Sequence, residues 1–375
     1  MKIIYCIAGT CHSGGMERVL ANKANYLTEH GYEVVIVTTD QQGLPPFFPL
    51  NEQIRCIDLG INYEENNGKS FANKLLHYPL KQYRHKKRLA AVLEQEKPDI
   101  TISMFCNDAS FITRINDGSK KILEIHFSKF KRLQYNRKGL WRLADLWRSR
   151  QDEKVVRRFD KFVVLTEEDK GYWGNLPNIT VIPNANTFST CQTAALENKK
   201  VIAIGRYTYQ KGFERLIEAW NSLSSEFPDW KLDIIGDGEE RGKLQNLIRS
   251  YHLEKQVTLV KPTQNIVQVY LDASLLVLSS RYEGLPMVLL EAQTFGLPIV
   301  SFACKCGPKD IVTNGENGFL VEEGDRKGLA RQMATVMKDE ALRRQMGRKA
   351  KEASRRYAED VVMAKWITLF DSLKG

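Results

Sequence analysis

The stretch that decides the fold runs from Ser279 to Val321 and reads SSRYEGLPMVLLEAQTFGLPIVSFACKCGPKDIVTNGENGFLV. An apolar run, LLVLSS, leads into it and predicts a strand. A loop, RYEGLP, follows, and then a helix, MVLLEAQTF, which Gly296, Leu297 and Pro298 bring to an end. A second strand, IVSF, completes a strand–helix–strand unit, which is the building block of a parallel sheet.

Two carboxylates stand in the loop and helix of this unit, Glu283 and Glu291, eight positions apart. Ligands of open parallel sheets bind beyond the carboxyl ends of the strands, where this loop is expected to lie. Gly284 allows the backbone to approach a ligand closely, and Pro286 is tolerated in a first helical turn. We expect the amides around Met287–Leu289 to be unpaired and to favour an anion such as a pyrophosphate.

Glu291 lies one turn deeper in the helix, where its carboxylate can accept hydrogen bonds from the two neighbouring hydroxyls of a ribose. Glu283 can do the same for a second sugar. The alternative interpretation is that Glu283 caps the helix and Glu291 is solvated. Val288, Leu289 and Leu290 precede Glu291, which indicates a buried carboxylate that needs a partner. The combination favours a nucleotide sugar as ligand.

The stretch Glu283-Gly-Leu-Pro-Met-Val-Leu-Leu-Glu291-Ala resembles the E-x7-E motif of the family 4 glycosyltransferases, and the downstream CGPKDIVTNGENGFLV is similar to that family as well. The resemblance extends over the whole chain and is closer in the second half. It implies an α/β protein of the GT-B fold, in which two Rossmann-like domains face each other across a cleft, and a transferase that retains the anomeric configuration. It looks most like enzymes of bacterial surface-polysaccharide assembly, such as capsule or lipopolysaccharide.

Two cations follow the first predicted strand of the second half, in GRYTYQKGFERLIEAW. Arg206 and Lys211 lie beside the next helix start, where both can reach a diphosphate. The alternative is a pair of ordinary surface cations. In the family that the chain resembles, this pair binds the donor's diphosphate and stabilises the leaving group electrostatically.

Weaker signals accompany these motifs. Gly14 and Gly15 in SGGMER can approach a phosphate, although most such pairs simply make a turn. A lone histidine such as His126 is more often structural, yet its position resembles a family histidine that hydrogen-bonds the transferred sugar. Gly236 begins a GDG loop that is too short to indicate a nucleotide site by itself. Lys261 stands near the place where the family holds the base.

Residue by residue, the resemblance implies one set of functional positions. Catalytic roles are expected for His126, Arg206, Lys211 and Glu283. Donor contacts are expected from Gly14, Gly15, Arg206, Lys211, Gly236, Lys261, Glu283, Gly284, Leu285, Pro286, Met287, Val288 and Glu291. No metal ligand or cofactor is predicted, since the chain lacks an Asp-x-Asp motif. Ala303 stands where many relatives have an acidic residue, which is a departure from the family pattern.

The length of 375 residues predicts two domains of similar size. We place an acceptor-binding domain at 1–185 and a nucleotide-sugar-binding domain at 186–355, joined by an Asn/Ser/Thr/Ala-rich linker. The resemblance adds a final helix, from about 356 to 375, that packs back on the first domain. No run approaches the length of about 18 apolar residues that a membrane span needs, and no secretory signal is evident. The seven scattered cysteines favour a reducing cytoplasm.

The formal net charge of +10 is concentrated in the first half. The segment 120–158 holds 13 lysines and arginines against 4 acidic residues, and KQYRHKKR at 81–88 has five basic residues. Aromatic residues lie among the basic residues of the longer segment: Phe127, Phe130, Tyr135, Trp141 and Trp147. This mixture suits an anionic membrane surface, with a solvated helix face as the equal alternative. Nucleic acid is not expected as a partner.

The resemblance, taken together with these patterns, implies a retaining hexosyltransferase located in the cytoplasm, with peripheral contact at the inner face of the membrane. It would move a hexose or N-acetylhexosamine from a nucleotide-diphosphate sugar, with a UDP-sugar expected, to a glycan or lipid-linked glycan. Two alternatives stay open from the sequence: a GT-B nucleotide-sugar epimerase, and a catalytically silent protein that binds an anionic surface. The sequence leaves the sugar, the linkage, the acceptor and the oligomeric state undetermined.

Overall fold

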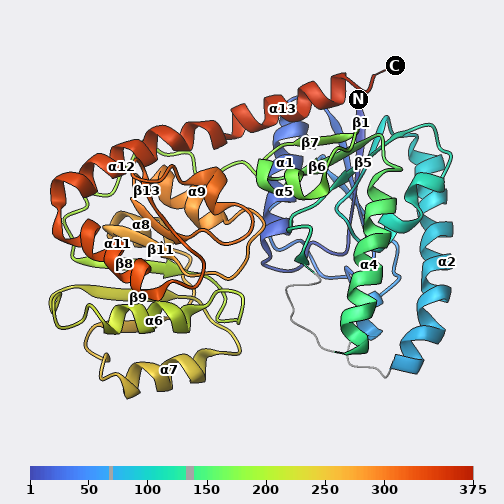
Figure 1. Cartoon of the computed structure of the whole chain (residues 1–375). Coiled ribbons are helices and arrows are strands. Elements are labelled where there is room, and N and C mark those ends of the chain that lie inside the picture. The colour runs from blue at the N-terminus through green and yellow to red at the C-terminus, as the bar shows by residue number, and fades with distance from the viewer. Residues whose placement is uncertain (67–70, 132–138, 375) are drawn as a thin grey trace. The chain divides into compact units, whose positions relative to one another are not determined.

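The fold contains two wholly parallel sheets, each with helices packed against it (Figure 1). It was obtained as a computed structural model, which describes residues 1–66, 71–131 and 139–374. The chain forms two compact units. The first comprises Met1–Leu165, Asp169–Ile182 and Met363–Gly375; the second comprises Thr166–Glu168 and Pro183–Val362. The expected α/β class is confirmed.

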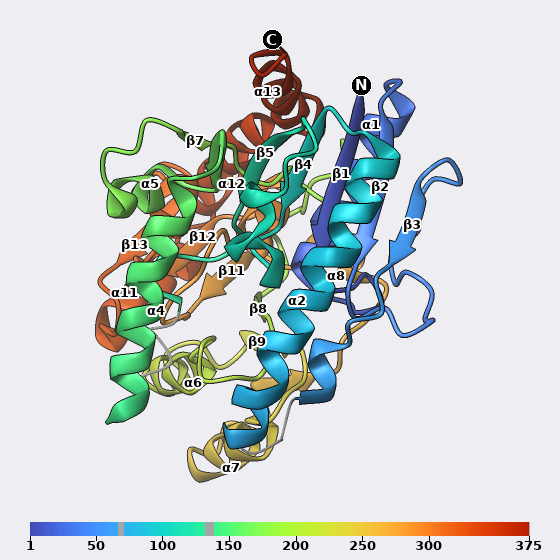
Figure 2. The same ribbon diagram turned by 90° about the vertical axis from the view of Figure 1, so that its right-hand side faces the viewer.

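The first unit is built on a seven-stranded sheet of order β3-β2-β1-β4-β5-β6-β7. Its strands are β1 (Lys2–Ile7), β2 (Glu33–Thr38), β3 (Arg55–Asp58), β4 (Ile100–Ser103), β5 (Lys120–Glu124), β6 (Lys161–Val164) and β7 (Ile179–Val181). Its helices are α1 (Gly15–Glu29), α2 (Phe71–Glu96), α4 (Leu140–Val156) and α5 (Glu167–Trp173), with single 3₁₀ turns at η1 (Tyr63–Asn66), η2 (Asn107–Ser110) and η3 (Ile112–Arg114). Figure 2 shows α2 running along this sheet.

The second unit is built on a six-stranded sheet of order β10-β9-β8-β11-β12-β13. Its strands are β8 (Lys200–Ile204), β9 (Lys231–Ile235), β10 (Val257–Val260), β11 (Leu275–Leu278), β12 (Ile299–Phe302) and β13 (Gly318–Val321). Its helices are α6 (Phe213–Asn221), α7 (Arg241–Ser250), α8 (Ile266–Leu271), α9 (Met287–Thr294), α10 (Pro308–Ile311), α11 (Arg326–Lys338) and α12 (Glu340–Ser354), followed by η4 (Arg355–Tyr357). Helix α13 (Glu359–Asp371) begins in this unit and continues into the segment Met363–Gly375 of the first. The strand order reverses between β8 and β11, which makes their carboxyl ends a topological switch point.

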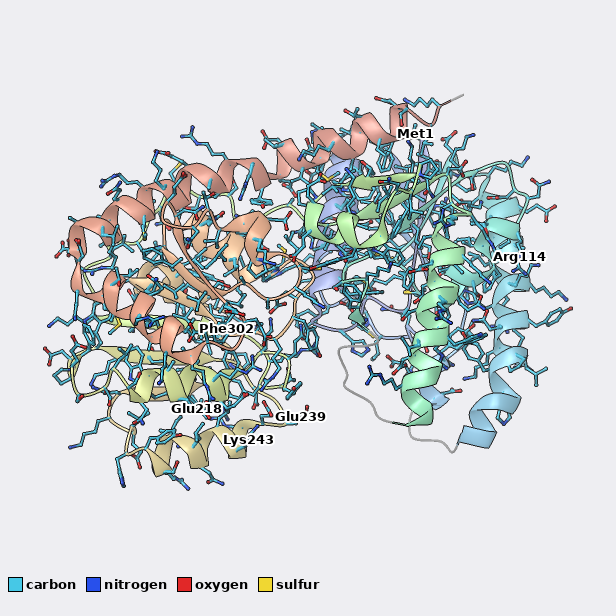
Figure 3. The ribbon with its side chains drawn as sticks, in the orientation of Figure 1. Met1, Arg114, Glu218, Glu239, Lys243 and Phe302 are labelled. Carbon is cyan, nitrogen blue, oxygen red and sulfur yellow. The ribbon has the colours of Figure 1, made fainter. Side chains whose placement is uncertain are left out.

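Apolar side chains on both faces of each sheet explain the fold. Strands that are covered by helices on both faces read as nearly continuous hydrophobic runs, as LLVL of β11 and IVSF of β12 do. Phe302 of β12 and Trp220 of α6 are fully buried in the core of the second unit. Glu218, which Figure 3 labels on the same α6, is partly exposed and pairs with Arg326 at the start of α11.

The structure adds to and adjusts the expected elements. Helix α1 begins at Gly15, so the last four residues of SGGMER form the first turn of this helix. The short α8 and the edge strand β13 were not predicted. The chain passes between the two units at Ile182 and Pro183, where the sequence placed the boundary after residue 185, and the last segment grouped with the first unit begins at Met363.

Candidate functional site

The E-x7-E stretch and the Arg206–Lys211 pair lie at the switch point of the second unit. Arg206 and Lys211 follow β8, and Glu283 follows β11, so both loops leave the same edge of the sheet from neighbouring strands. Parallel sheets bind ligands at this edge because the strand order diverges there and opens a crevice. The topology therefore brings together residues that are more than 70 positions apart in the sequence.

The two loops are joined by hydrogen bonds. The hydroxyl of Ser279 donates to the backbone carbonyl of Lys211 over 2.9 Å. The side-chain amide of Gln210 donates to the backbone carbonyl of Tyr282 over 3.0 Å. Gly212 has a φ of 61°, and a Cβ placed there would lie 2.5 Å from the carbonyl oxygen of Ser279. Only glycine therefore allows the β8 loop to turn this close to the β11 loop. The result is a fixed backbone platform for the charged side chains.

Glu283 and Lys211 form the ionic centre of this platform. The ammonium of Lys211 donates to Oε1 of Glu283 over 2.7 Å, and the Ser280 hydroxyl donates to the same oxygen over 2.6 Å. The side chain of Glu283 is 7% exposed and that of Lys211 is 18% exposed. Within the described residues, Oε2 of Glu283 accepts no hydrogen bond. A carboxylate held on one oxygen and open on the other is suited to receive a hydroxyl of a ligand.

Arg206 differs from Lys211 in being exposed. Its backbone carbonyl accepts the amide of Thr208, but its guanidinium has no protein partner among the residues that the structure describes. An unengaged guanidinium presents five donors in a rigid fork, which matches phosphate oxygens better than an ammonium does. Arg206 therefore adds positive charge to the site without being required for the fold.

Gly236 places the β9 loop in direct contact with the β8 loop. A Cβ on Gly236 would lie 1.9 Å from the carbonyl oxygen of Gly205. Tyr207 secures this approach, since its hydroxyl donates to the carbonyl of Ile234 over 2.6 Å and lies 3.1 Å from that of Val260. Burial raises the pKa of Tyr207 to about 12, only partly opposed by nearby Arg241, so the phenol stays a hydrogen-bond donor at neutral pH.

The helix start after Glu283 corrects one expectation. Pro286 is the residue before α9, and the amide of Leu289 donates to its carbonyl over 2.9 Å. Leu289 is therefore not available to an anion. The amides of Met287 and Val288 have no acceptor within the described part of the chain. The start of α9 therefore offers an anion one unpaired amide fewer than the sequence suggested.

The segment Gly284–Pro286 is held from behind by the loop after β12. Gly307 has a φ of 97°, and a Cβ there would lie 2.3 Å from Cδ of Pro286. The backbone amide of Glu283 also donates to the carbonyl of Lys305 over 3.1 Å. Leu285 is buried, whereas Gly284 is partly accessible. The CGP sequence thus supports the loop on which Glu283 stands.

Glu291 is buried, as its apolar neighbours indicated, with 6% exposure. The hydroxyl of Tyr270 on α8 donates to its Oε2 over 2.6 Å. Tyr270 is fully buried and stacks on Phe295 with ring centroids 5.2 Å apart. This contact fixes one oxygen of the carboxylate from the core side.

We expect Tyr270→Phe to lower the free energy of unfolding by about 1–3 kcal/mol, because a buried carboxylate loses a hydrogen-bond donor. The ring stacking on Phe295 is retained in this variant. Denaturant unfolding measures the change. Tyr251→Phe, which alters a partly exposed tyrosine of the same unit, is the matched control. A stability equal to the wild type would show that the contact with Glu291 contributes nothing.

Three predicted site residues belong to the first unit: Gly14 and Gly15 follow β1, and His126 follows β5. Gly14 precedes α1, and Gly15 is its first residue. A Cβ on Gly14 would lie 2.1 Å from a carboxylate oxygen of Glu17, whereas Gly15 has open space around it. His126 follows β5, and its side chain is 7% exposed. Lys261, after β10 in the second unit, is exposed.

Three residues of the site were missed by the sequence analysis: Ser280, Tyr207 and Tyr270. Ser280 carried a detectable signal, since a hydroxyl at the end of an apolar strand, three positions before Glu283, is well placed to reach it. Tyr207 and Tyr270 carried none, because their hydrogen bonds cross between elements whose adjacency only the sheet order fixes.

Comparison with known proteins identifies the family of the chain. The family model for Glycosyl transferases group 1 matches residues 189–353, and that for Glycosyltransferase Family 4 matches residues 13–185. An uncharacterized glycosyltransferase of Haemophilus influenzae is 32% identical over 97% of this chain and 98% of its own length. The amylovoran biosynthesis glycosyltransferase AmsD of Erwinia amylovora is 28% identical over 97% of this chain and 98% of its own.

A third relative comes from Campylobacter jejuni and is named GalNAc-alpha-(1->4)-GalNAc-alpha-(1->3)-diNAcBac-PP-undecaprenol alpha-1,4-N-acetyl-D-galactosaminyltransferase. It is 26% identical over 100% of this chain and 99% of its own. Among solved structures, a sucrose-phosphate synthase of Thermosynechococcus elongatus superposes with a TM-score of 0.83 at 18% identity, covering 99% of this chain and 98% of its own.

Anabaena HepE in complex with UDP has a TM-score of 0.77 at 17% identity, covering 99% of this chain and 100% of that one. At these identities the solved structures establish the fold alone, whereas the first relative extends over nearly both chains above 30% identity. The chain therefore belongs to the GT4-type glycosyltransferases and is a hexosyltransferase with the GT-B fold.

Proposed function

We propose that the protein is a retaining glycosyltransferase that takes a hexose or N-acetylhexosamine from a UDP-sugar and transfers it to a glycan or lipid-linked glycan in polysaccharide synthesis. The observation that carries the proposal is the ionic site at the switch point: Lys211 on Glu283, the unengaged Arg206 and the open amides of Met287 and Val288. A diphosphate matches the cationic groups, and a sugar hydroxyl matches the open oxygen of Glu283.

In this proposal the donor binds the second unit. Arg206, Lys211 and the start of α9 neutralise the diphosphate as it leaves, and Glu291 accepts hydrogen bonds from the ribose. Gly236 and Lys261 lie along the nucleotide. The acceptor hydroxyl attacks from the face that the diphosphate leaves, and its proton passes to the departing phosphate oxygen. No enzymic nucleophile takes part, and the positive charge comes from side chains and amides without a metal or other cofactor.

Two similarities support the choice of donor and acceptor. HepE of Anabaena was solved in complex with UDP. The Campylobacter relative is named for an undecaprenol-linked glycan, and AmsD for amylovoran biosynthesis. In the proposal, Gly14, Gly15 and His126 of the first unit approach the transferred sugar and the acceptor. The reaction takes place on the cytoplasmic face of the membrane.

The test begins with calorimetry of the purified protein against UDP, GDP and ADP, with and without EDTA. We expect binding that is selective for UDP and survives EDTA. The sugar conjugates of the nucleotide that binds are then incubated with acceptors. NMR of the product gives the configuration at the transferred anomeric carbon. Loss of binding in EDTA would refute metal independence, and an inverted product would refute retention. Turnover of the UDP-sugar to an isomer without any acceptor would identify an epimerase instead.

Contact with an anionic membrane is proposed for α4. Trp147 is 62% exposed, and Arg150 and Lys154 lie three and seven positions further on the same helix, so the three share an exposed face. Lys129 is a poorer candidate than the sequence suggested, because it donates to the carbonyl of Tyr172 over 2.9 Å. No helix of the described residues combines the length and apolarity needed to cross a bilayer.

The other predicted members of this surface are less exposed or lie outside the described residues. Lys131 lies over the ring of Phe127 at 4.0 Å, and Phe130 packs on Tyr172 with centroids 4.9 Å apart. Arg132, Tyr135 and the side chain of Trp141 lie outside the part of the chain that the structure describes. The membrane proposal therefore rests on the exposed face of α4.

Reversing two charges on this face, in Arg150→Glu/Lys154→Glu, is expected to weaken binding to phosphatidylglycerol vesicles at least about tenfold, since each basic side chain near an anionic surface contributes about 1 kcal/mol. Vesicle co-sedimentation measures the change. The matched control is Lys255→Glu/Lys327→Glu, which alters net charge equally at exposed positions of the second unit. Equal weakening in both variants would show that only net charge acts.

A further inference from the structure

The first unit contains a buried ion pair that the proposed reaction does not use. Lys23 of α1 donates to Oε1 of Glu124 on β5 over 2.5 Å, and their side chains are 5% and 1% exposed. Removing two charges from water costs several kcal/mol per ion, and such pairs often contribute less to stability than apolar residues of the same size. Stability alone is therefore a weak reason for this pair.

Glu124 and His126 lie on the same face of the extended β5 segment. Leu123 and Ile125 point to the other face, where they pack in the core with α2 and α4. The amide of Ile125 still pairs with the carbonyl of Val163, so the extended backbone continues past the end of β5. This alternation directs Glu124 and His126 toward the face that Lys23 of α1 occupies.

The imidazole of His126 approaches the carboxylate that Lys23 holds. Its Nε2 lies 3.1 Å from Oε1 of Glu124, but the angle between the two groups does not meet the geometry of a hydrogen bond. Both ring nitrogens and Oε2 of Glu124 are buried and lack a hydrogen-bond partner among the described residues, as does the hydroxyl of Tyr5. Folded proteins rarely leave buried polar atoms unpaired, so this concentration indicates a place that a ligand completes.

The C-terminal helix closes the cluster. Trp366 of α13 is 1% exposed, and the ammonium of Lys23 lies 3.8 Å from the centre of its ring. Burial lowers the pKa of Lys23, but a cation over an indole face is stabilised by the ring. Burial alone would raise the pKa of Glu124, but the ammonium of Lys23 and the nearby imidazole of His126 outweigh it and lower that pKa to about 2. Glu124 is therefore ionised at neutral pH.

We propose that Glu124 is a positioning residue for His126, held in place by Lys23 beneath Trp366, and that it fixes the imidazole in the tautomer with the proton on Nε2. Nδ1 is then the acceptor that meets a hydroxyl of the sugar or acceptor. The inference rests on the proposed function only for the identity of that hydroxyl. The tautomer and its dependence on Glu124 are properties of the free protein.

The experiment compares two double variants. Lys23→Met/Glu124→Leu replaces the pair by apolar residues of similar size. Lys121→Met/Asp117→Leu does the same to another buried pair of this unit, whose side chains are 7% and 2% exposed. In the described part of the chain, neither residue forms a hydrogen bond or ion pair with His126. Both are expected to fold, because apolar replacement of a whole buried pair is often neutral for stability. Circular dichroism and the melting temperature check this.

The first readout is the ¹⁵N spectrum of histidine side chains, in which the signal of His126 among the six histidines is assigned by its loss in His126→Gln. We expect the wild type and the Lys121/Asp117 variant to show the Nε2–H tautomer, and the Lys23/Glu124 variant to show a mixture. The second readout is turnover. We expect kcat to fall about ten- to a hundredfold in the Lys23/Glu124 variant only, with the dissociation constant of UDP unchanged.

An unchanged tautomer in the Lys23/Glu124 variant would overturn the inference, as would full retention of kcat in a variant whose tautomer has changed. If this variant unfolds, Glu124→Gln, which keeps size and shape, supplies the same two readouts. A wild-type protein without sugar transfer would refute the proposed function, while the spectrum would still decide whether Glu124 sets the tautomer of His126.

Discussion

Replacing Arg206 by alanine is expected to lower kcat by about 10²- to 10³-fold, the usual effect of losing one preorganised group that stabilises developing charge. The guanidinium is exposed and has no protein partner among the described residues, so the fold does not depend on it. The free energy of unfolding should therefore stay within about 0.5 kcal/mol of the wild type. Steady-state kinetics and thermal unfolding on the same preparation measure both quantities.

Two further variants sharpen this result. Arg206→Lys keeps the charge but loses the planar fork, so it should recover only part of the activity. Arg249→Ala removes an exposed arginine from α7 and should leave kcat unchanged. Wild-type kcat in Arg206→Ala would mean that Lys211 and the amides of α9 neutralise the leaving diphosphate without Arg206.

Gly236→Ala is expected to damage both stability and nucleotide binding. The added methyl would lie 1.9 Å from the carbonyl oxygen of Gly205, so the β8 and β9 loops must separate. Such overpacking costs about 1–3 kcal/mol. That corresponds to a fall in melting temperature of roughly 2–12 °C for a unit of this size. Because the moved loops carry the site, UDP binding should weaken at least about tenfold, which is about 1.4 kcal/mol.

Gly242→Ala is the matched control for this prediction. Gly242 lies within α7 of the same unit, and a Cβ there meets no atom within 4 Å. Gly242 is the second residue of this helix, where alanine gains less than the about 0.5–1 kcal/mol it gains over glycine in a helix interior, so this variant should be at least as stable as the wild type. If Gly236→Ala behaved like Gly242→Ala in calorimetry and thermal unfolding, the close approach of the two loops would have no role in the site.

Much of the candidate site was predictable because its signals are local. Glu283 and Glu291 are fixed by one loop and one helix, and the apolar residues before Glu291 correctly indicated its burial. The sequence analysis overestimated the number of unpaired amides at the start of α9 by one. The turn in which the amide of Leu289 donates to the carbonyl of Pro286 has no recognisable sequence signal. The roles of these residues toward a donor stay predictions.

The partners of the predicted residues were not predictable, for a different reason. Lys211 meets Glu283 across 72 positions, and Lys23 meets Glu124 across 101. Tyr270 stands on a helix too short for its period to be recognised. Each contact depends on which strands are neighbours and on which face of the sheet a helix packs.

The sequence by itself determined the α/β class, the alternation of strands and helices, and the glycosyltransferase family, since hydrophobic period and motif spacing are properties of short segments. Only the tertiary structure decided that β8 and β11 are adjacent, that Ser280 and Lys211 share one oxygen of Glu283, and that Trp366 covers the Lys23–Glu124 pair. The physical reason is that burial and pairing energies depend on distances in space, which the order of residues along the chain does not contain.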